Sequence, residues 1–239
     1  MDYRLRLGGF VLMLTVAGCG TQELVADSPA EEMGQEGTED TQLDEEVEGG
    51  TSGDHHDDQP VAIDPYDYFL ADKSTAHFEG SGNEFAEFTL KTDYLEANHI
   101  ATYEDNGGTV MLKVYRLHDD RIELVKQEGE FYDEYTASFE ELEALDVMST
   151  YLEFPIEEGQ EIGNATVVET GASVETPYQK FTDVFVLESL AAEGSSINRN
   201  YFVEGFGEVK REFLANPDDS KDMAITSTLA SIELGESTK

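Results

Sequence analysis

The chain has 239 residues and carries 53 acidic against 14 basic side chains, which gives a formal net charge of −39. This balance argues against nucleic acid as a partner and against electrostatic adhesion to anionic lipid head groups, because both need clustered Lys and Arg. Hydrophobic residues make up 39% of the chain, enough for a core, and the single cysteine excludes an intramolecular disulfide framework.

The first eighteen residues have the three-part layout of a secretory signal, with two arginines, an apolar run over residues 7–16, and small residues before Cys19. The run is too short to span a membrane as a helix, which needs about 20 apolar residues. The ending Val16–Cys19 resembles the lipobox of bacterial lipoproteins, which implies cleavage before Cys19 and a diacylglyceryl group on its thiol. We therefore predict a signal peptide over residues 1–18 and a lipid-anchored protein on the extracytoplasmic face of the cell membrane. The alternative is a buried structural cysteine after an ordinary cleavage site.

Residues 19–60 are predicted to form a disordered acidic tether that begins at the lipidated cysteine. After Cys19 this segment contains no Lys, Arg or aromatic residue, so it cannot bury enough apolar surface to offset the entropy of ordering. Its carboxylates repel one another and extend the chain. A loose cation buffer is the alternative, although no ordered calcium-binding loop pattern is present. The run His55–Asp58 is a candidate transition-metal ligand set, and whether any metal binds stays open.

From residue 61 onward aromatic and β-branched residues become frequent, which predicts a single β-rich domain over residues 61–239. Ser138, followed by Glu141 three residues later, is a capping-box pattern and predicts one short helix. The sequence Asp105–Gly108 predicts a hairpin turn, since Asn-Gly suits the positive φ angles of such turns. Apolar alternation and turn residues predict strands at residues 85–92, 99–104, 109–117, 121–126, 181–188, 200–204, 208–213 and 226–234.

Strands at roughly ten-residue spacing with short turns favour a mainly β fold. We expect an antiparallel curled sheet, as a barrel or a sandwich, with at most one or two short helices. The chain gives a weak indication of two halves that meet near residues 153–155, without a strict internal repeat. Gly205 and Gly207 flank Phe206 between two predicted strands and favour a turn, with a ligand-contacting loop as the alternative.

Short motifs with a common order are spread over residues 66–234. They are Asp67–Phe69, Phe78–Glu84, Phe154–Ile156 with Gly159, Thr176–Tyr178 with Phe181 and Val184, and Tyr201–Lys210. In this order they resemble an uncharacterised lipoprotein family of Gram-positive bacteria, which combines a lipobox signal with a β-rich extracytoplasmic domain. Ile162 stands where that family has a tryptophan. The resemblance implies the location and the fold class, and it brings no activity or site residue.

The sequence contains no motif for a catalytic nucleophile, neither a G-x-S-x-G elbow nor an S-x-x-K pattern. His77, His99 and His118 lie in or beside predicted strands without the H-E-x-x-H pattern of zinc hydrolases, so we interpret them as structural or surface residues. Carboxylate pairs are too numerous for any one of them to identify a glycosidase site. The polar stretch 216–222 is interpreted as a solvated loop, with a cation-holding loop as the alternative. We predict no catalytic residue and no cofactor.

These observations favour a non-enzymatic binding or interaction module of the cell envelope, whose partner is an envelope protein or polymer. The second hypothesis is a cation-binding or ion-sensing lipoprotein, suggested by the acidic clusters. The third is a hydrolase with a carboxylate-based site. The acidity has a further interpretation, because a salt-rich habitat favours negatively charged surfaces whose self-repulsion is screened by counterions.

Overall fold

The computed structural model of the protein describes residues 63–191, 196–215 and 224–235, which belong to one compact unit of the chain. The signal peptide with Cys19, the tether over residues 19–60 with its run His55–Asp58, and the stretch 216–222 lie outside the described residues. The predictions made for these segments therefore stay predictions.

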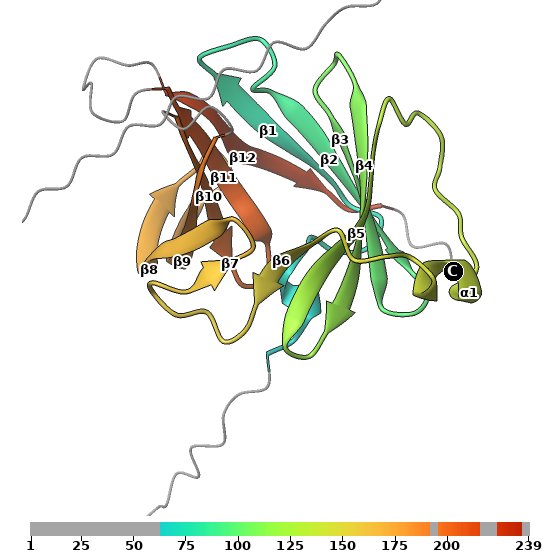
Figure 1. The fold of residues 1–239 in the computed structure, drawn as a ribbon. Coiled ribbons are helices and arrows are strands. Elements are labelled where there is room, and N and C mark those ends of the chain that lie inside the picture. The colour runs from blue at the N-terminus through green and yellow to red at the C-terminus, as the bar shows by residue number, and fades with distance from the viewer. Residues whose placement is uncertain (1–62, 192–195, 216–223, 236–239) are drawn as a thin grey trace, which may run out of the picture. The chain divides into compact units, whose positions relative to one another are not determined.

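Within the described residues, twelve strands form one antiparallel sheet, so the predicted mainly β fold is confirmed (Figure 1). Two short helical elements accompany it, the 3-10 turn η1 (Pro65–Tyr68) and the helix α1 (Phe139–Glu143). The strands are β1 (Thr75–Ser81), β2 (Phe88–Leu95), β3 (His99–Asp105), β4 (Val110–His118), β5 (Arg121–Gly129), β6 (Ser149–Glu153), β7 (Glu161–Ile162), β8 (Ala165–Glu175), β9 (Lys180–Leu190), β10 (Ile197–Val203), β11 (Gly207–Leu214) and β12 (Ile225–Glu233).

The strand order explains why the sequence suggests two halves. Across the sheet the order is β6-β5-β4-β3-β2-β1-β12-β11-β10-β9-β8-β7. In chain order, β1 to β6 are therefore added one after another from the middle of the sheet to one edge. Strands β7 to β12 are added from the other edge back to the middle. The first and last strands pair antiparallel, with Ala76 opposite Ile232. The chain passes from one edge to the other between Glu153 and Glu161, close to the boundary expected from the sequence.

The two edge strands, β6 and β7, lie close together, so the sheet curls into a nearly closed barrel. A Cβ atom built on Gly163, next to β7, would lie 3.1 Å from the carbonyl oxygen of Thr150 in β6. Leu152 of β6 and Ile162 of β7 also belong to one buried core cluster. Of the two architectures that the sequence left open, the structure is therefore a barrel-like sheet and not a sandwich.

The turn between β10 and β11 packs against η1 and shapes one end of the barrel. Gly205 has a φ of 85° and its amide donates a 2.7 Å hydrogen bond to the carbonyl of Asp67. Gly207 has a φ of 72°, and a Cβ atom on it would overlap the carbonyl oxygen of Tyr68. Tyr68 and Phe69 in turn join the buried cluster inside the sheet. The two glycines thus form the predicted turn, which contacts η1.

The connection from β5 to β6 covers the outer face of β3, β4 and β5. The predicted capping box is present, since Ser138 Oγ accepts from the Glu141 amide at 3.3 Å and Glu141 Oε2 accepts from the Ser138 amide at 2.8 Å. Leu142 of α1 is fully buried in a cluster with Ala101 and Val114 of the sheet, among others. The helix is therefore positioned by its cap and by one apolar anchor.

Some strand predictions are wrong in detail. The strand predicted to begin at residue 85 begins at Phe88, because Asn83 Oδ1 accepts from the Phe85 amide at 2.9 Å and holds a turn there. At the β3–β4 turn only Gly107 has a positive φ, where the sequence suggested positive angles for Asn-Gly together. The long strand β8 was missed because its pairing with β9 is interrupted by several register shifts, around a positive-φ Gly171. Strands β1, β6 and β7 were missed as well.

A matched pair of substitutions tests the packing of this turn on η1. Gly205→Ala places a Cβ in open space and should cost about 1 kcal/mol of unfolding free energy, the strain of a left-handed backbone. Gly207→Ala adds the overlap with the Tyr68 carbonyl and should cost about 2 to 4 kcal/mol. Urea denaturation followed by tyrosine fluorescence measures both values, and equal losses would contradict the assigned role of Gly207.

Candidate functional site

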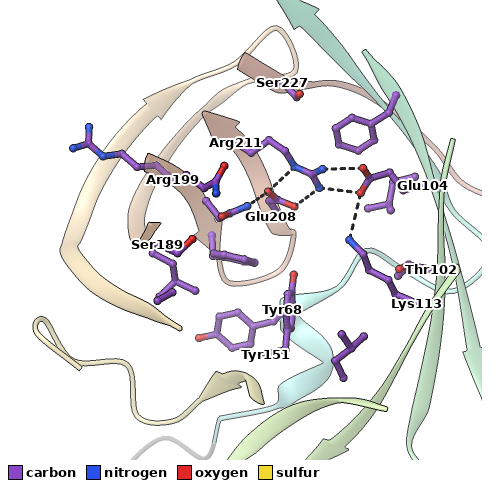
Figure 2. A pocket seen from close by; sticks show the side chains of 18 of the residues that line it. Tyr68, Thr102, Glu104, Lys113, Tyr151, Ser189, Arg199, Glu208, Arg211 and Ser227 are labelled. Carbon is purple, nitrogen blue, oxygen red and sulfur yellow. Dashed lines mark hydrogen bonds and ion pairs between the residues drawn. The ribbon is translucent and has the colours of Figure 1, made fainter. Parts of the chain in front are cut away.

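A cavity of about 550 Å³ lies inside the curled sheet. Its volume is within the range of small-molecule sites, roughly 300 to 1,000 Å³. Side chains of β2 to β12 line it, together with residues of η1 and the β1–β2 loop. Figure 2 shows that these side chains converge on the interior from opposite walls of the sheet. The cavity is therefore a property of the closed sheet and not of one loop.

A guanidinium at the centre of the lining joins two carboxylates (Figure 2). Arg211 on β11 donates to both oxygens of Glu104 on β3, from Nη1 at 2.9 Å and from Nη2 at 3.1 Å. It also donates to Glu208, from Nε at 3.0 Å and from Nη2 at 2.7 Å. Asn200 Nδ2 donates to Glu208 Oε1 at 2.6 Å. Because β3 and β11 are separated by three strands in the sheet order, this network links distant parts of the wall.

A β-bulge makes the network possible. Glu208 and Arg211 are three residues apart, and regular alternation would turn them to opposite faces of β11. The register between β10 and β11 shifts here, since Tyr201 lies opposite Lys210 while Phe202 lies opposite Glu208. Val209 is thus an extra residue without a partner in β10, the arrangement of a bulge. Both charged side chains consequently face the interior.

The charges of the network balance one another. Burial alone would raise the pKa of Glu104, but the positive charges of Arg211 and Lys113 outweigh it and hold that pKa below its usual range. Burial acts in the opposite sense on Arg211, yet Glu208 and Glu104 keep its pKa well above the ordinary value. About 29% of the Arg211 side chain and 27% of the Lys113 side chain stay exposed, and both residues line the cavity. The network and Lys113 therefore bring two positive and two negative groups into one interior space, and Arg199 and Glu212 add one of each sign to its lining.

A row of polar side chains crosses four neighbouring strands on the wall that carries Glu104. The register places Thr92 of β2 opposite Thr102 of β3, Thr102 opposite Lys113 of β4, and Lys113 opposite Gln127 of β5. All four residues line the cavity. Thr92 Oγ1 is buried and has no hydrogen-bond partner among the described residues. Lys113 Nζ lies 3.6 Å from Glu104 Oε2, well beyond the usual 2.7–2.9 Å of a charge-assisted hydrogen bond.

Aromatic and aliphatic side chains make up the rest of the lining. The Phe88 ring lies under the guanidinium, with Arg211 Cζ 4.5 Å from its centroid. Tyr115 and Tyr151 pack together at 4.7 Å between ring centroids. Burial raises the pKa of both phenols, which therefore keep their protons at neutral pH. Phe85, which is 56% exposed, also belongs to the lining, so the cavity extends to the protein surface beside the β1–β2 loop.

The three histidines of the domain do not line this cavity. His99 is fully buried, with Nδ1 2.6 Å from the Ala97 carbonyl and Nε2 accepting from Arg116 Nε at 3.2 Å. A carbonyl can only accept, so Nδ1 carries the hydrogen, and burial lowers the pKa of this neutral ring. His118 pairs with Glu123 at 3.1 Å on the wall, and His77 is partly exposed on β1.

No three His, Cys, Asp or Glu side chains gather to hold a metal ion within the described ranges. The described helices also include none that is both long and apolar enough to cross a membrane. Comparison with known proteins gives no match to this chain, whether with protein-family models, curated proteins or solved structures.

No motif in the sequence marks the residues of the network. Glu104, Lys113, Glu208 and Arg211 lie in predicted strands, but so many charged residues do that none stands out. Alternation does not mark Glu104, because both faces of β3 are buried, Ile100 and Thr102 on one and Ala101 and Tyr103 on the other. It does not mark Arg211 either, since the direction of this side chain depends on the bulge at Val209.

Removal of the central guanidinium should destabilise the fold. Arg211→Met removes the guanidinium between Glu104 and Glu208 and leaves only Lys113, 3.6 Å from Glu104. We expect a loss of about 3 kcal/mol of unfolding free energy, the low end for buried pairs because the Arg211 side chain is 29% exposed. The matched control is Arg199→Met. Arg199 pairs with Glu188 at 2.8 Å, is 37% exposed and points away from the network in Figure 2, so its loss should cost under about 1 kcal/mol. Urea denaturation at pH 7.5 measures both, and similar losses would contradict the assigned role of Arg211.

Proposed function

We propose that this chain is a lipoprotein, anchored through Cys19 on the extracytoplasmic face of the cell membrane, whose β domain is a non-enzymatic binding module. The observation that supports it best is the interior cavity of about 550 Å³ with polar side chains on its walls. We propose that a small molecule occupies this cavity. The expected partner is therefore an envelope component that is small enough to enter the barrel, or that carries a group small enough to do so.

Packing supports this proposal. Protein interiors are close-packed, and voids larger than a water molecule are few. An enclosed sheet that only needed stability would fill its centre with apolar side chains, which pack without the desolvation cost of charges. Here the centre contains Glu104, Lys113, Glu208 and Arg211 around open space instead. A cavity with fixed polar groups and apolar walls is the usual form of a ligand site.

The same network argues against a hydrolase site and against a cation site in the interior. A carboxylate-based hydrolase needs one carboxyl group as a proton donor, but Glu104 and Glu208 both bind Arg211, and the pKa of Glu104 is lowered. A cation site needs carboxylate oxygens that are free to coordinate, and these oxygens already accept hydrogen bonds from Arg211. The cation-binding alternative thus depends on residues outside the described ranges, above all the acidic tether.

The anchor is tested by one substitution. Cys19→Ala should abolish metabolic labelling with a radioactive fatty acid and release the protein from washed membranes, because the diacylglyceryl group can form only on the thiol. Cys19→Ser, which also lacks the thiol, should give the same result. Membrane retention of both variants without label would refute the proposed anchor.

The interior site is tested with the neutral fluorescent probe N-phenyl-1-naphthylamine on the mature chain, residues 19–239 with Cys19→Ala. We expect saturable fluorescence enhancement, since the probe enters an apolar, water-poor space. Ser189→Phe narrows the cavity and should weaken binding at least about tenfold, a loss of about 1.4 kcal/mol. Ser231→Phe on the exposed part of β12 is the control and should leave binding unchanged. Absent binding, or equal binding by all three proteins, would refute an interior site.

A further inference from the structure

We propose that the ligand is a neutral amphipathic molecule whose carbonyl-type acceptor binds Lys113, with its apolar part against the aromatic lining. This inference rests on the proposed interior site and specifies the chemistry of its ligand. Three features carry it: the filled hydrogen-bond capacity of the network, the spare donors of Lys113, and the neutral charge balance of the cavity.

The carboxylates of the network have little capacity left for a ligand. Each oxygen of Glu104 and Glu208 accepts at least one hydrogen bond from Arg211, and Glu208 Oε1 also accepts from Asn200. In return, Arg211 uses all three of its nitrogen atoms as donors to these carboxylates. A cationic ligand would meet oxygens that are already paired, and an anionic ligand would meet a guanidinium that is already enclosed.

Lys113 is the charged group with donors to spare. Its ammonium has three N–H bonds, and the nearest carboxylate oxygen, on Glu104, lies 3.6 Å away and is shared with Arg211. Thr102 stands beside it in the same row, since opposed positions on neighbouring strands lie about 4.5–5.5 Å apart at Cβ, and Thr92 follows on the far side of Thr102. The Thr92 hydroxyl has no partner among the described residues. Lys113, whose side chain stays 27% exposed, therefore offers donors to an acceptor that the described residues do not supply.

Charge balance decides between a neutral and an acidic acceptor. The cavity lining already holds three carboxylates, two guanidinium groups and one ammonium, so its charges balance, and a carboxylate ligand would leave one negative charge uncompensated in a poorly solvated space. The strongly acidic chain would also oppose its approach. A carbonyl oxygen of an amide or ester accepts from Lys113 without adding charge. The apolar remainder of such a molecule fits against Phe88 and Phe85, toward the surface end of the lining.

The experiment is competition for bound N-phenyl-1-naphthylamine by three unbranched ten-carbon compounds with different head groups, at pH 7.5. We expect decanamide to displace the probe at a concentration at least about tenfold below decanoate or decylamine. Displacement by decanoate at the lower concentration would overturn the neutral class and leave the interior site standing. Failure of the probe itself to bind would refute the site and this inference together.

Substitution of Lys113 gives the second measurement. Lys113→Met keeps the length of the side chain and removes the donors, so decanamide affinity should fall about tenfold, the loss expected for one hydrogen bond to a charged group. The probe has no carbonyl acceptor, so its own affinity should change by less than about twofold, which also shows that the variant is folded. Lys126→Met is the control, because Lys126 stacks on Tyr135 and pairs with Glu128, and it does not line the cavity. Equal decanamide affinity of Lys113→Met and the unmodified chain would overturn the assignment.

Discussion

The balance of charge inside a closed sheet is the constraint on which the rest of the domain depends. A sheet that curls on itself has one face turned away from bulk water, so each charge on that face needs a partner within reach. Arg211 supplies that partner for two carboxylates and joins β11 to β3 across the interior. The bulge at Val209 is required for this arrangement, because it turns Glu208 and Arg211 to the same side. Without the guanidinium, Glu208 would have no cation within 4.0 Å among the described residues, and Glu104 would keep only Lys113.

The interior is divided into a packed end and an open part. Around Phe69, Leu152 and Phe202 the space is filled by one apolar cluster, which η1 and the Gly205–Gly207 turn cover. The network and the polar row of β2 to β5 lie beside the remaining cavity. A rigid apolar end fixes the curvature of the sheet and hence the distance between Glu104 and Arg211. The site is therefore precise because it is built on strands and supported by a close-packed core.

The features that the sequence predicted correctly are those governed by neighbouring residues. The capping box of Ser138, the turn at Gly205 and the hairpin joining β3 to β4 depend on short-range rules, and the structure contains all three. The sheet order, the pairing of β1 with β12 and the approach of β6 to β7 depend on contacts distant in the chain, which alternation does not specify. The site belongs to this second class. Its polar row exists only through cross-strand register, and its guanidinium faces inward only through a bulge.

The positions of the cations show how an acidic domain keeps a neutral interior. Every Lys and Arg of the described residues except Lys180 lies within 4.0 Å of a carboxylate oxygen. Basic residues are scarce, yet three of them, Lys113, Arg199 and Arg211, line the cavity, where the excess of acid would be least tolerated. The surplus carboxylates are left on the surface, where salt screens their repulsion over about 10 Å. Salt should thus change the stability of the domain more than the chemistry of the cavity, because the interior charges are already compensated by one another.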